Sequence, residues 1–430
     1  MVPECDSMPY SRPAYRPPAA PRPHSHRLPR PTYWRRRLVV LFVLAVVIFL
    51  GYLAATLFFA LLNPSYGSSL STRASQWGRQ HGLASVVNWS ANEAYHWDLP
   101  KKGGTPPPGS FGAGAITKTY KTPSALAPPV NIVSPVKNPL PGEGVWHVAG
   151  RTTANGIPTM YEAFVRPDKV HTSYVVGVVW MDMNLLTAQL YPGSQVPGGG
   201  PFWHNAPISA NRSKTLVAAF NSGFLMQNAE GGYFTDDHTY KKLRKGAASV
   251  VIFKNGRMTI AKWGRDVVMN NQIASVRQNL DLIVDNSKEV HGLRNPKSTM
   301  WGTVIGANDD VWRSGLGITK SGALVYVGGP GMSLSDLADV MLRAGVEEGM
   351  ELDYGLDWVQ LSTFTGVPDK VIDASNGLSL LSSMPGAPTR YFGSFWAHDF
   401  FTMSLRGNEL RKTVSSTTAS STTTTTTTPG

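Results

Sequence analysis

The segment ALVYVGGPGMSLSDLADVMLRAGVEEGMELDYG, from Ala323 to Gly355, places one amphipathic helix between two strand-like runs. Ser333 and Asp336 have the spacing of a helix capping box, and Gly345 is a residue type at which helices often end. The apolar residues recur on one helical stripe, at Leu334, Leu337, Ala338 and Met341. The segment therefore predicts a strand, a helix and a second strand.

A strand, helix, strand unit makes a right-handed crossover and brings its two strands parallel into one sheet. Asp353 then falls at the carboxyl end of the second strand, the edge at which open sheets bind ligands. The stretch GMELDYGLDWVQ at this edge holds Glu351, Asp353 and Asp357 among large apolar side chains. A catalytic strand end and a solvated acidic turn are both open interpretations.

Short apolar runs separated by Gly, Pro, Asn and Asp surround this unit, which is typical of strands. They include SYVVGVVWMDM, TLVAAFNSGF, ASVVIFKNGRMTIAKW and LDLIVDN, with hairpin turns predicted at FKNGRM and TKSGAL. The expected fold class is α/β, or mixed α+β, with one mixed β-sheet domain that contains the crossover. We expect this globular domain to run from 145 to 406.

An apolar segment from Leu38 to Leu62 carries no charge and is long enough to cross the roughly 30 Å hydrocarbon layer as a helix. Three consecutive Arg residues at 35–37 precede it, and the next basic residue is Arg73, so the positive-inside rule predicts a cytoplasmic N-terminus. A cleaved signal peptide is the alternative, although its apolar region usually has only about 7–15 residues. We expect a single-pass protein of the cell membrane with an extracytoplasmic main domain.

The flanking segments have compositions that favour disorder or linkers. Residues 1–37 are rich in Pro and Arg and residues 407–430 in Ser and Thr, so we expect both to be disordered tails. Residues 63–144 are rich in Pro and Gly and predict a spacer with a short helix near 75–92. Half of the net charge of +12 comes from residues 1–37, which argues against a nucleic-acid-binding domain. The single Cys5 permits no intrachain disulfide.

Two further segments carry polar residues at strand ends. AAFNSGFLMQ places Asn221 after an apolar strand, where the following Ser222 and Gly223 allow a sharp turn. WRSGLGITKSGAL begins with Arg313, and its glycines allow a backbone or ligand to approach closely. With the helix GMSLSDLA and the acidic strand, these segments resemble, in order and spacing, the phosphodiester glycosidase family. That family includes the enzyme that uncovers mannose 6-phosphate by removing N-acetylglucosamine, and the chain resembles a divergent, membrane-anchored bacterial member.

The resemblance covers residues 173–364 and is uneven along them. The family's Asn-Gly-Gly-Phe turn is matched at 221–224, and its Arg-containing strand with a glycine turn at Arg313, Gly317 and Gly322. Its Gly-Met-Thr-Leu helix start is matched at 331–338. The final Gly-rich strand end keeps three residues, Leu352, Asp353 and Gly355. It departs from the family at four positions, Glu351, Tyr354, Leu356 and Asp357.

The resemblance implies hydrolysis at a sugar phosphodiester and carries over Asp353, and the spacing on the strand adds Glu351, so we expect Asp353 and Glu351 as the catalytic residues. The two lie two apart on a strand, so both project to one face with Cα atoms about 6.5–7 Å apart. Their carboxyl groups could span the roughly 5–9.5 Å used in glycoside hydrolysis, or could be solvated or Arg-paired. We expect substrate binding by four further residues, Asn221, Gly223, Arg313 and Asp357. Arg313 could hold a phosphate or neutralise Asp353, and Asn221 is also suited to a turn.

Few other motifs suggest chemistry. The segment GGYFTDDHTYKK could offer metal ligands from Asp236, Asp237 and His238, but a polar loop is the preferred interpretation, because one short segment cannot show converging ligands. No P-loop, dinucleotide fingerprint, zinc spacing or Gly-x-Ser-x-Gly elbow occurs, so we expect neither a metal nor a cofactor. Several Trp residues, among them Trp358, suit sugar stacking or simply fill cores.

The expected function is a membrane-anchored extracytoplasmic hydrolase that cleaves a sugar-phosphodiester bond in a cell-envelope glycan. Its expected partners are the lipid bilayer and that glycan, and no nucleic acid. The alternative is a non-catalytic envelope protein of the same fold that binds glycan or has a structural role.

Overall fold

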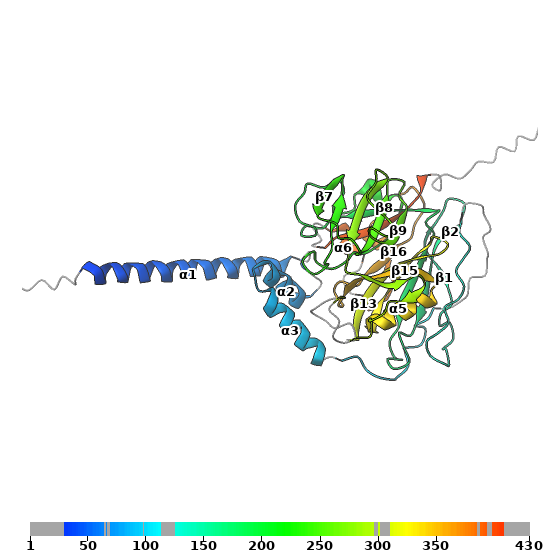
Figure 1. Cartoon of the computed structure of the whole chain (residues 1–430), viewed down its shortest axis with the longest axis horizontal. Helices are drawn as coiled ribbons and strands as arrows, with labels where there is room; N and C mark the ends of the chain where they lie inside the picture. The colour runs from blue at the N-terminus through cyan, green and yellow to red at the C-terminus, as the bar shows by residue number, and fades with distance from the viewer. Residues whose placement is uncertain are drawn as a thin grey trace, which may run out of the picture. The chain divides into compact units, whose positions relative to one another are not determined.

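The computed structural model describes residues 30–63, 66, 69–97, 99–112, 125–295, 300–301, 310–384, 388–393 and 398–407. Most of the two tails that the sequence predicts, before residue 30 and after residue 407, lies outside the described residues. Figure 1 shows the described elements coloured by their position along the chain, from blue near the N-terminus to red near the C-terminus.

Helix α1 (Arg30–Leu62) contains the apolar segment that the sequence predicts as a membrane span. Residues Tyr33–Leu62 of this helix are long and apolar enough to cross a membrane, and none of the most apolar stretch is buried in protein. A signal sequence near an N-terminus can also meet these criteria of length and hydropathy.

Three β-sheets form the folded part of the chain. The largest has the strand order β1 (His147–Thr152), β2 (Pro158–Val165), β3 (Val176–Met181), β14 (Leu324–Met332), β13 (Val311–Thr319), β15 (Val346–Tyr354), β11 (Leu282–Asp285) and β12 (Lys288–Glu289). The second has the order β7 (His238–Lys241), β6 (Tyr233–Thr235), β10 (Ile273–Gln278), β8 (Ala248–Phe253) and β9 (Met258–Lys262). The third has the order β17 (Gly377–Ser379), β16 (Leu361–Phe364), β5 (Leu216–Asn221), β18 (Phe400–Leu405) and β4 (Leu186–Tyr191).

Six shorter helices accompany the sheets in the described part of the chain. They are α2 (Leu70–Gln80), α3 (Ala84–Trp97), α4 (Ala210–Ser213), α5 (Leu334–Arg343), the 3-10 helix η2 (Ala374–Asn376) and α6 (Thr389–Phe392). The mixed α+β fold class that the sequence predicts is confirmed. The two predicted hairpins are also present, between β8 and β9 and between β13 and β14.

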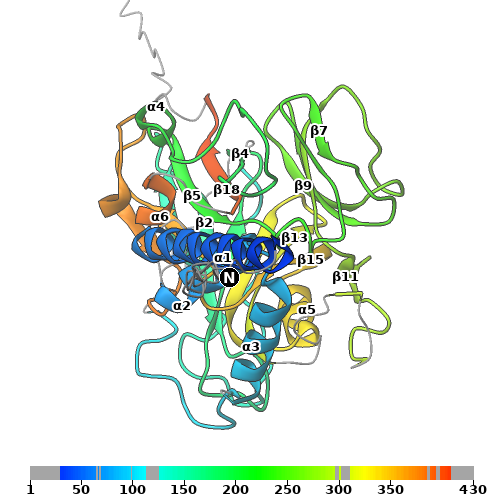
Figure 2. The same ribbon diagram turned by 90° about the vertical axis from the view of Figure 1, so that its left-hand side faces the viewer.

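The predicted crossover is the unit β14, α5 and β15. Both strands pair antiparallel with β13, which lies between them, so β14 and β15 run in the same direction within one sheet. The capping box of Ser333 and Asp336 is formed, and α5 lies alongside β15 (Figure 2). Its apolar stripe is fully buried, and a Cβ on Gly315 of β13 would lie only 2.6 Å from Cε of Met341. A glycine there lets the helix approach the sheet closely.

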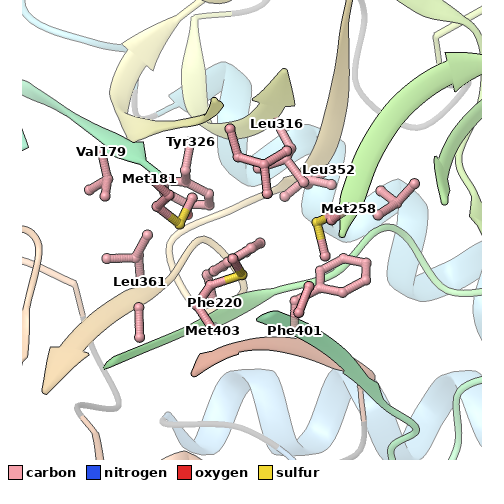
Figure 3. Close-up of a cluster of buried hydrophobic side chains, with 14 of the residues drawn as sticks. Val179, Met181, Phe220, Met258, Leu316, Tyr326, Leu352, Leu361, Phe401 and Met403 are labelled. Atoms are coloured by element: carbon pink, nitrogen blue, oxygen red, sulfur yellow. The ribbon is translucent and has the colours of Figure 1, made fainter. Parts of the chain in front are cut away.

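The main core joins all three sheets (Figure 3). Val179, Leu316 and Leu352 come from the largest sheet and Met258 from the second. The third sheet contributes Phe220, Leu361, Phe401 and Met403. Because the core is shared, the ends of β5 and β15 are held in fixed positions relative to each other.

The segment 63–144, which the sequence predicts as a spacer, contains the helices α2 and α3 and a packed stretch before β1. Ile132 is buried in a hydrophobic cluster with residues of β2 and β3. Glu143 forms a buried ion pair with Arg166, with 2.8 Å between Oε2 and Nη2. Packing against the sheets therefore begins before residue 145.

Candidate functional site

The carboxyl end of β15 lies beside the end of β5, and one serine connects them. Oγ of Ser314 on β13 donates to the backbone oxygen of Asp353 at 3.0 Å and accepts from Nδ2 of Asn221 at 3.0 Å. The backbone N–H of Asp353 also donates to this hydroxyl, at 3.2 Å. Asn221 and Asp353, which lie far apart in the sequence, are thus brought together at one sheet edge.

The side chain of Asn221 is occupied by protein contacts. Its Oδ1 accepts from the hydroxyl of Tyr326 at 2.9 Å and from the backbone N–H of Gln360 at 3.0 Å. Its Nδ2 also donates to the backbone oxygen of Ser222 at 2.8 Å. These hydrogen bonds fix the turn after β5 and the loop before β16, so Asn221 acts here as a positioning residue. Contact between Asn221 and a substrate stays a prediction.

Asp353 is buried except at a small cavity. Its side chain accepts from the backbone N–H of Tyr354 at 2.8 Å, and Nδ1 of His398 lies 3.6 Å from its Oδ2. Burial raises the pKa of Asp353, and the neighbouring His398 opposes that rise. A carboxyl group with a raised pKa beside an imidazole is suited to proton transfer.

His398 was not among the residues that the sequence singled out. It lies just before β18, in the sequence His-Asp that precedes an apolar strand, whereas Asn221 and Asp353 lie at the carboxyl ends of theirs. The indole of Trp358 stacks on its ring, with 3.9 Å between centroids and 14° between planes. This stacking limits the orientation of the imidazole next to Asp353.

Two adjoining cavities open at this edge. The smaller, of about 50 Å³, is lined by Asp353 and His398 together with Gln76, Arg79, Phe224, Leu225, Asn228, Tyr354 and Trp358. The larger, of about 360 Å³, shares Gln76, Arg79, Tyr354 and Trp358 with it and continues between α2, α3 and the loop 355–358. Helix α2 thus supplies one wall, including the cation of Arg79, to a site whose other wall is the end of β15.

Glu351 has a different environment from Asp353, although both lie on β15. Its Oε1 is 2.6 Å from Nη1 of Arg313, and each side chain is only 1 % exposed. Burial raises the pKa of Glu351 to about 7, and Arg313 opposes that rise. Neither of the two cavities is lined by Glu351 or Arg313. The predicted neutralisation of Asp353 by Arg313 is replaced by this ion pair with Glu351.

Gly223 allows the turn after β5 to approach β15. A Cβ at this position would lie 2.6 Å from Oδ1 of Asn279, which accepts from the backbone N–H of Phe224 at 3.0 Å. Nδ2 of Asn279 donates to the backbone oxygens of Glu351 and Leu352, both at 3.0 Å. Asn279, which sequence reasoning missed, therefore ties the two site segments together.

A second buried ion pair supports His398. Nε of Arg277 lies 2.9 Å from Oδ2 of Asp399, and both side chains are almost completely buried. Arg277 also donates to the backbone oxygens of Gln278 and Phe224. The pair thus fixes the residue after His398 against the turn that contains Gly223, and sequence reasoning missed it as well.

The loop after β15 contains the bulky residues that depart from the family pattern. Tyr354 lines both cavities and packs edge-on against Phe224, with 5.1 Å between ring centroids. Leu356 is 44 % exposed, so it does not fill the site. The carboxylate of Asp357 accepts from the hydroxyl of Thr72 on α2, and its backbone oxygen accepts from Arg390 at 2.6 Å. Asp357 therefore joins the loop to α2 and lines the larger cavity.

The segment with Asp236, Asp237 and His238 forms the hairpin turn between β6 and β7. Asp236 and Asp237 have φ angles of 53° and 56°, as a tight hairpin turn requires. Asp236 accepts from the backbone N–H of Trp203 at 2.8 Å, and Asp237 lies 4.0 Å from the amine of Lys254. The polar-loop interpretation describes this segment.

A family comparison covers about a third of the chain and includes the end of β15. Residues 214–355 match the family model described as phosphodiester glycosidase. Among curated proteins, none matches the chain.

Two solved structures resemble the chain at low identity. One is a hypothetical protein from Synechocystis, with 11 % identity and a TM-score of 0.32, which covers 57 % of this chain and 62 % of that one. The other is a candidate exported protein from Burkholderia pseudomallei K96243, with 13 % identity and a TM-score of 0.25, which covers 59 % of this chain and 76 % of that one. Across residues 214–355 the chain matches the phosphodiester glycosidase family, as the motifs in its sequence indicate.

Proposed function

We propose that the folded domain is an extracytoplasmic hydrolase, anchored by α1, that cleaves a sugar-phosphodiester bond in a cell-envelope glycan. The observation that carries the proposal is the placement of Asp353. This carboxyl group is 5 % exposed, lines a cavity at the sheet edge and lies 3.6 Å from His398. The match of residues 214–355 to the phosphodiester glycosidase family supports the type of bond.

The proposed reaction uses the raised pKa of Asp353. The protonated carboxyl group donates to the phosphate oxygen that leaves as the bond between that oxygen and the anomeric carbon breaks. Water adds to the anomeric carbon, and its proton returns to the pair formed by Asp353 and His398, which restores the starting state. Arg79, which lines both cavities, supplies a positive charge for the phosphate.

The remaining site residues have supporting roles in this proposal. Glu351 neutralises Arg313 and fixes the end of β15, rather than acting as a second catalytic carboxylate. Asn221 and Gly223 shape the turn that faces Asp353, and Asp357 closes the loop against α2. The three Arg residues at 35–37 favour an orientation in which the domain meets envelope glycans outside the membrane.

The proposal is tested by Asp353→Asn in the full chain, purified in detergent and assayed on a chromogenic sugar phosphodiester. Loss of a proton donor is expected to lower the rate by roughly 10²–10⁴-fold. The melting temperature should hardly change, because Arg313 pairs with Glu351 and not with Asp353. Asp237→Asn is the matched control, since that side chain is 65 % exposed and lies in a hairpin turn.

Two outcomes would contradict the proposal. If the wild-type chain binds glycan without hydrolysing it and Asp353→Asn abolishes binding, the protein is the non-catalytic glycan-binding alternative. The contact between Thr72 and Asp357, which closes the loop against α2, is the feature that favours that alternative. If Asp353→Asn instead lowers the melting temperature strongly and a second replacement at His398, its ionisable neighbour, restores it, the acidic strand serves the fold.

A further inference from the structure

A second group of polar side chains lies at the same edge of the largest sheet, outside the two cavities. Asp168 and His171 belong to the loop after β2, and Asp310 directly precedes β13. One ligand atom from each of the three lies within 4.8 Å of the others. His171 is 4 % exposed, whereas the side chains of Asp168 and Asp310 are 16 % and 30 % exposed, so a buried imidazole lies between two partly exposed carboxylates.

Asp168 orients the imidazole. Its Oδ1 accepts from the backbone N–H groups of Val170 and His171, at 2.6 and 2.5 Å. Its Oδ2 lies 2.7 Å from Nδ1 of His171, a hydrogen bond that places the proton on Nδ1. In the neutral imidazole Nε2 is then the nitrogen whose lone pair is available to a metal ion. A carboxylate behind a histidine is the usual arrangement that orients a metal-binding imidazole.

On the other side of the ring, the distance between Nε2 of His171 and the carboxylate of Asp310 fits two ligands of one cation better than a hydrogen bond. Nε2 of His171 lies 3.5 Å from Oδ2 of Asp310, which is long for a hydrogen bond. A tetrahedral zinc ion with ligand distances of about 2.0–2.2 Å holds neighbouring ligand atoms about 3.4 Å apart. The nitrogen and the oxygen are therefore spaced as two ligands of one such ion.

We propose that Nε2 of His171 and the carboxylate of Asp310 bind a divalent cation of the zinc type, with Asp168 as the positioning residue. Water completes the coordination. Val311, next to Asp310, pairs with Met332 at the end of β14, so the ion ties the loop after β2 to the start of β13, beside the junction of β14 and α5. This inference does not depend on the proposed hydrolysis.

The test is a Zn²⁺ titration of the detergent-purified full chain by calorimetry, together with melting curves at fixed Zn²⁺ and with a chelator. Zn²⁺ is expected to bind with one-to-one stoichiometry and to raise the melting temperature, because a ligand that binds only the folded state stabilises it. His171→Asn and Asp310→Asn should abolish both effects. Asp168→Asn should weaken binding by roughly 10–100-fold, the usual cost of losing the carboxylate behind a ligand.

His238→Asn is the matched control, because His238 is an exposed histidine beside two aspartates in a hairpin turn. It should leave the affinity unchanged. Replacement of Zn²⁺ by Co²⁺ should also give the intense visible absorption of tetrahedral cobalt in the wild type and the control. The proposal is overturned if His171→Asn binds Zn²⁺ as the wild type does. It is also overturned if Zn²⁺ leaves the wild-type melting temperature unchanged while His171→Asn lowers it, which would identify a buried imidazolium held by two carboxylates.

Discussion

Asp353 and Glu351 show how two carboxylates on one strand acquire different properties. Each is almost completely buried, and burial raises the pKa of both. Glu351 is neutralised by Arg313 at 2.6 Å, whereas Asp353 meets an imidazole at 3.6 Å and a cavity. The local sequence does not distinguish the two carboxylates, because both project to the same face of one strand. Only their neighbours in the fold distinguish a fixed ion pair from a group that a substrate could reach.

Glu162 on β2 is a third carboxyl group with a raised pKa and gives a prediction of pH dependence. Burial raises its pKa from 4.5 to about 7. The unfolded chain therefore loses this proton at lower pH than the folded chain, and the penalty to folding grows as the pH rises from about 4.5 to 7. Glu162→Gln removes the charge and should stabilise the protein above pH 7 by about 1–3 kcal/mol.

This expectation is checked by denaturant unfolding of the wild type and Glu162→Gln at about pH 4.5, 6 and 8, a range set by the two pKa values. The difference in free energy of unfolding should be smallest at the lowest pH and reach a plateau above 7. A difference that stays constant across this range would mean that Glu162 is ionised in the folded state with an ordinary pKa.

Helix α5 is the element whose sequence pattern and environment agree most closely. Its predicted stripe is fully buried against β13, β14 and β15, and its cap residues make the expected hydrogen bonds. Helix α2 is the opposite case, because its composition is polar and its role as a wall of both cavities comes from tertiary contacts.

Leu337→Asp is expected to destabilise the folded domain by more than about 4 kcal/mol, because it places an unpaired charge against the sheet. Met341→Asp should act in the same way. Asp339→Asn, which loses only the partly exposed ion pair with Arg343, should cost less than about 1 kcal/mol. Thermal unfolding followed by circular dichroism measures all three variants. An unchanged midpoint for Leu337→Asp would show that a different face of the helix packs on the sheet.

At the scale of the whole molecule, the orientation in the membrane depends on where the positive charge lies along the chain more than on the total net charge. Eight Arg residues among the first 37 give that segment half of the net charge of +12. They directly precede the apolar segment of α1, which is long enough to cross a membrane. The end of a membrane span that carries more basic residues usually stays in the cytoplasm during insertion.

Protease added to intact cells is therefore expected to digest the chain after Asn63 and to spare the tail before Arg35. Epitope tags at the two ends, read by immunoblot before and after permeabilisation, would follow the two parts separately. Protection of the C-terminal tag in intact cells would contradict the orientation. Release of the domain into the medium without protease would instead indicate a cleaved signal peptide.

The sequence by itself determined the local structure of the crossover, the two hairpins and the apolar segment of α1, because hydrophobic period, capping residues and turn residues act over a few positions. Its motifs also indicated the family match. It also placed Asn221 and Asp353 at strand ends. The tertiary structure decided the partners of those residues. His398, Asn279, Arg277 and Arg79 come from elements distant in the sequence, and only the packing of three sheets and α2 brings them to the end of β15. Burial and pairing then separate Asp353 from Glu351, since both depend on neighbours that no local pattern specifies.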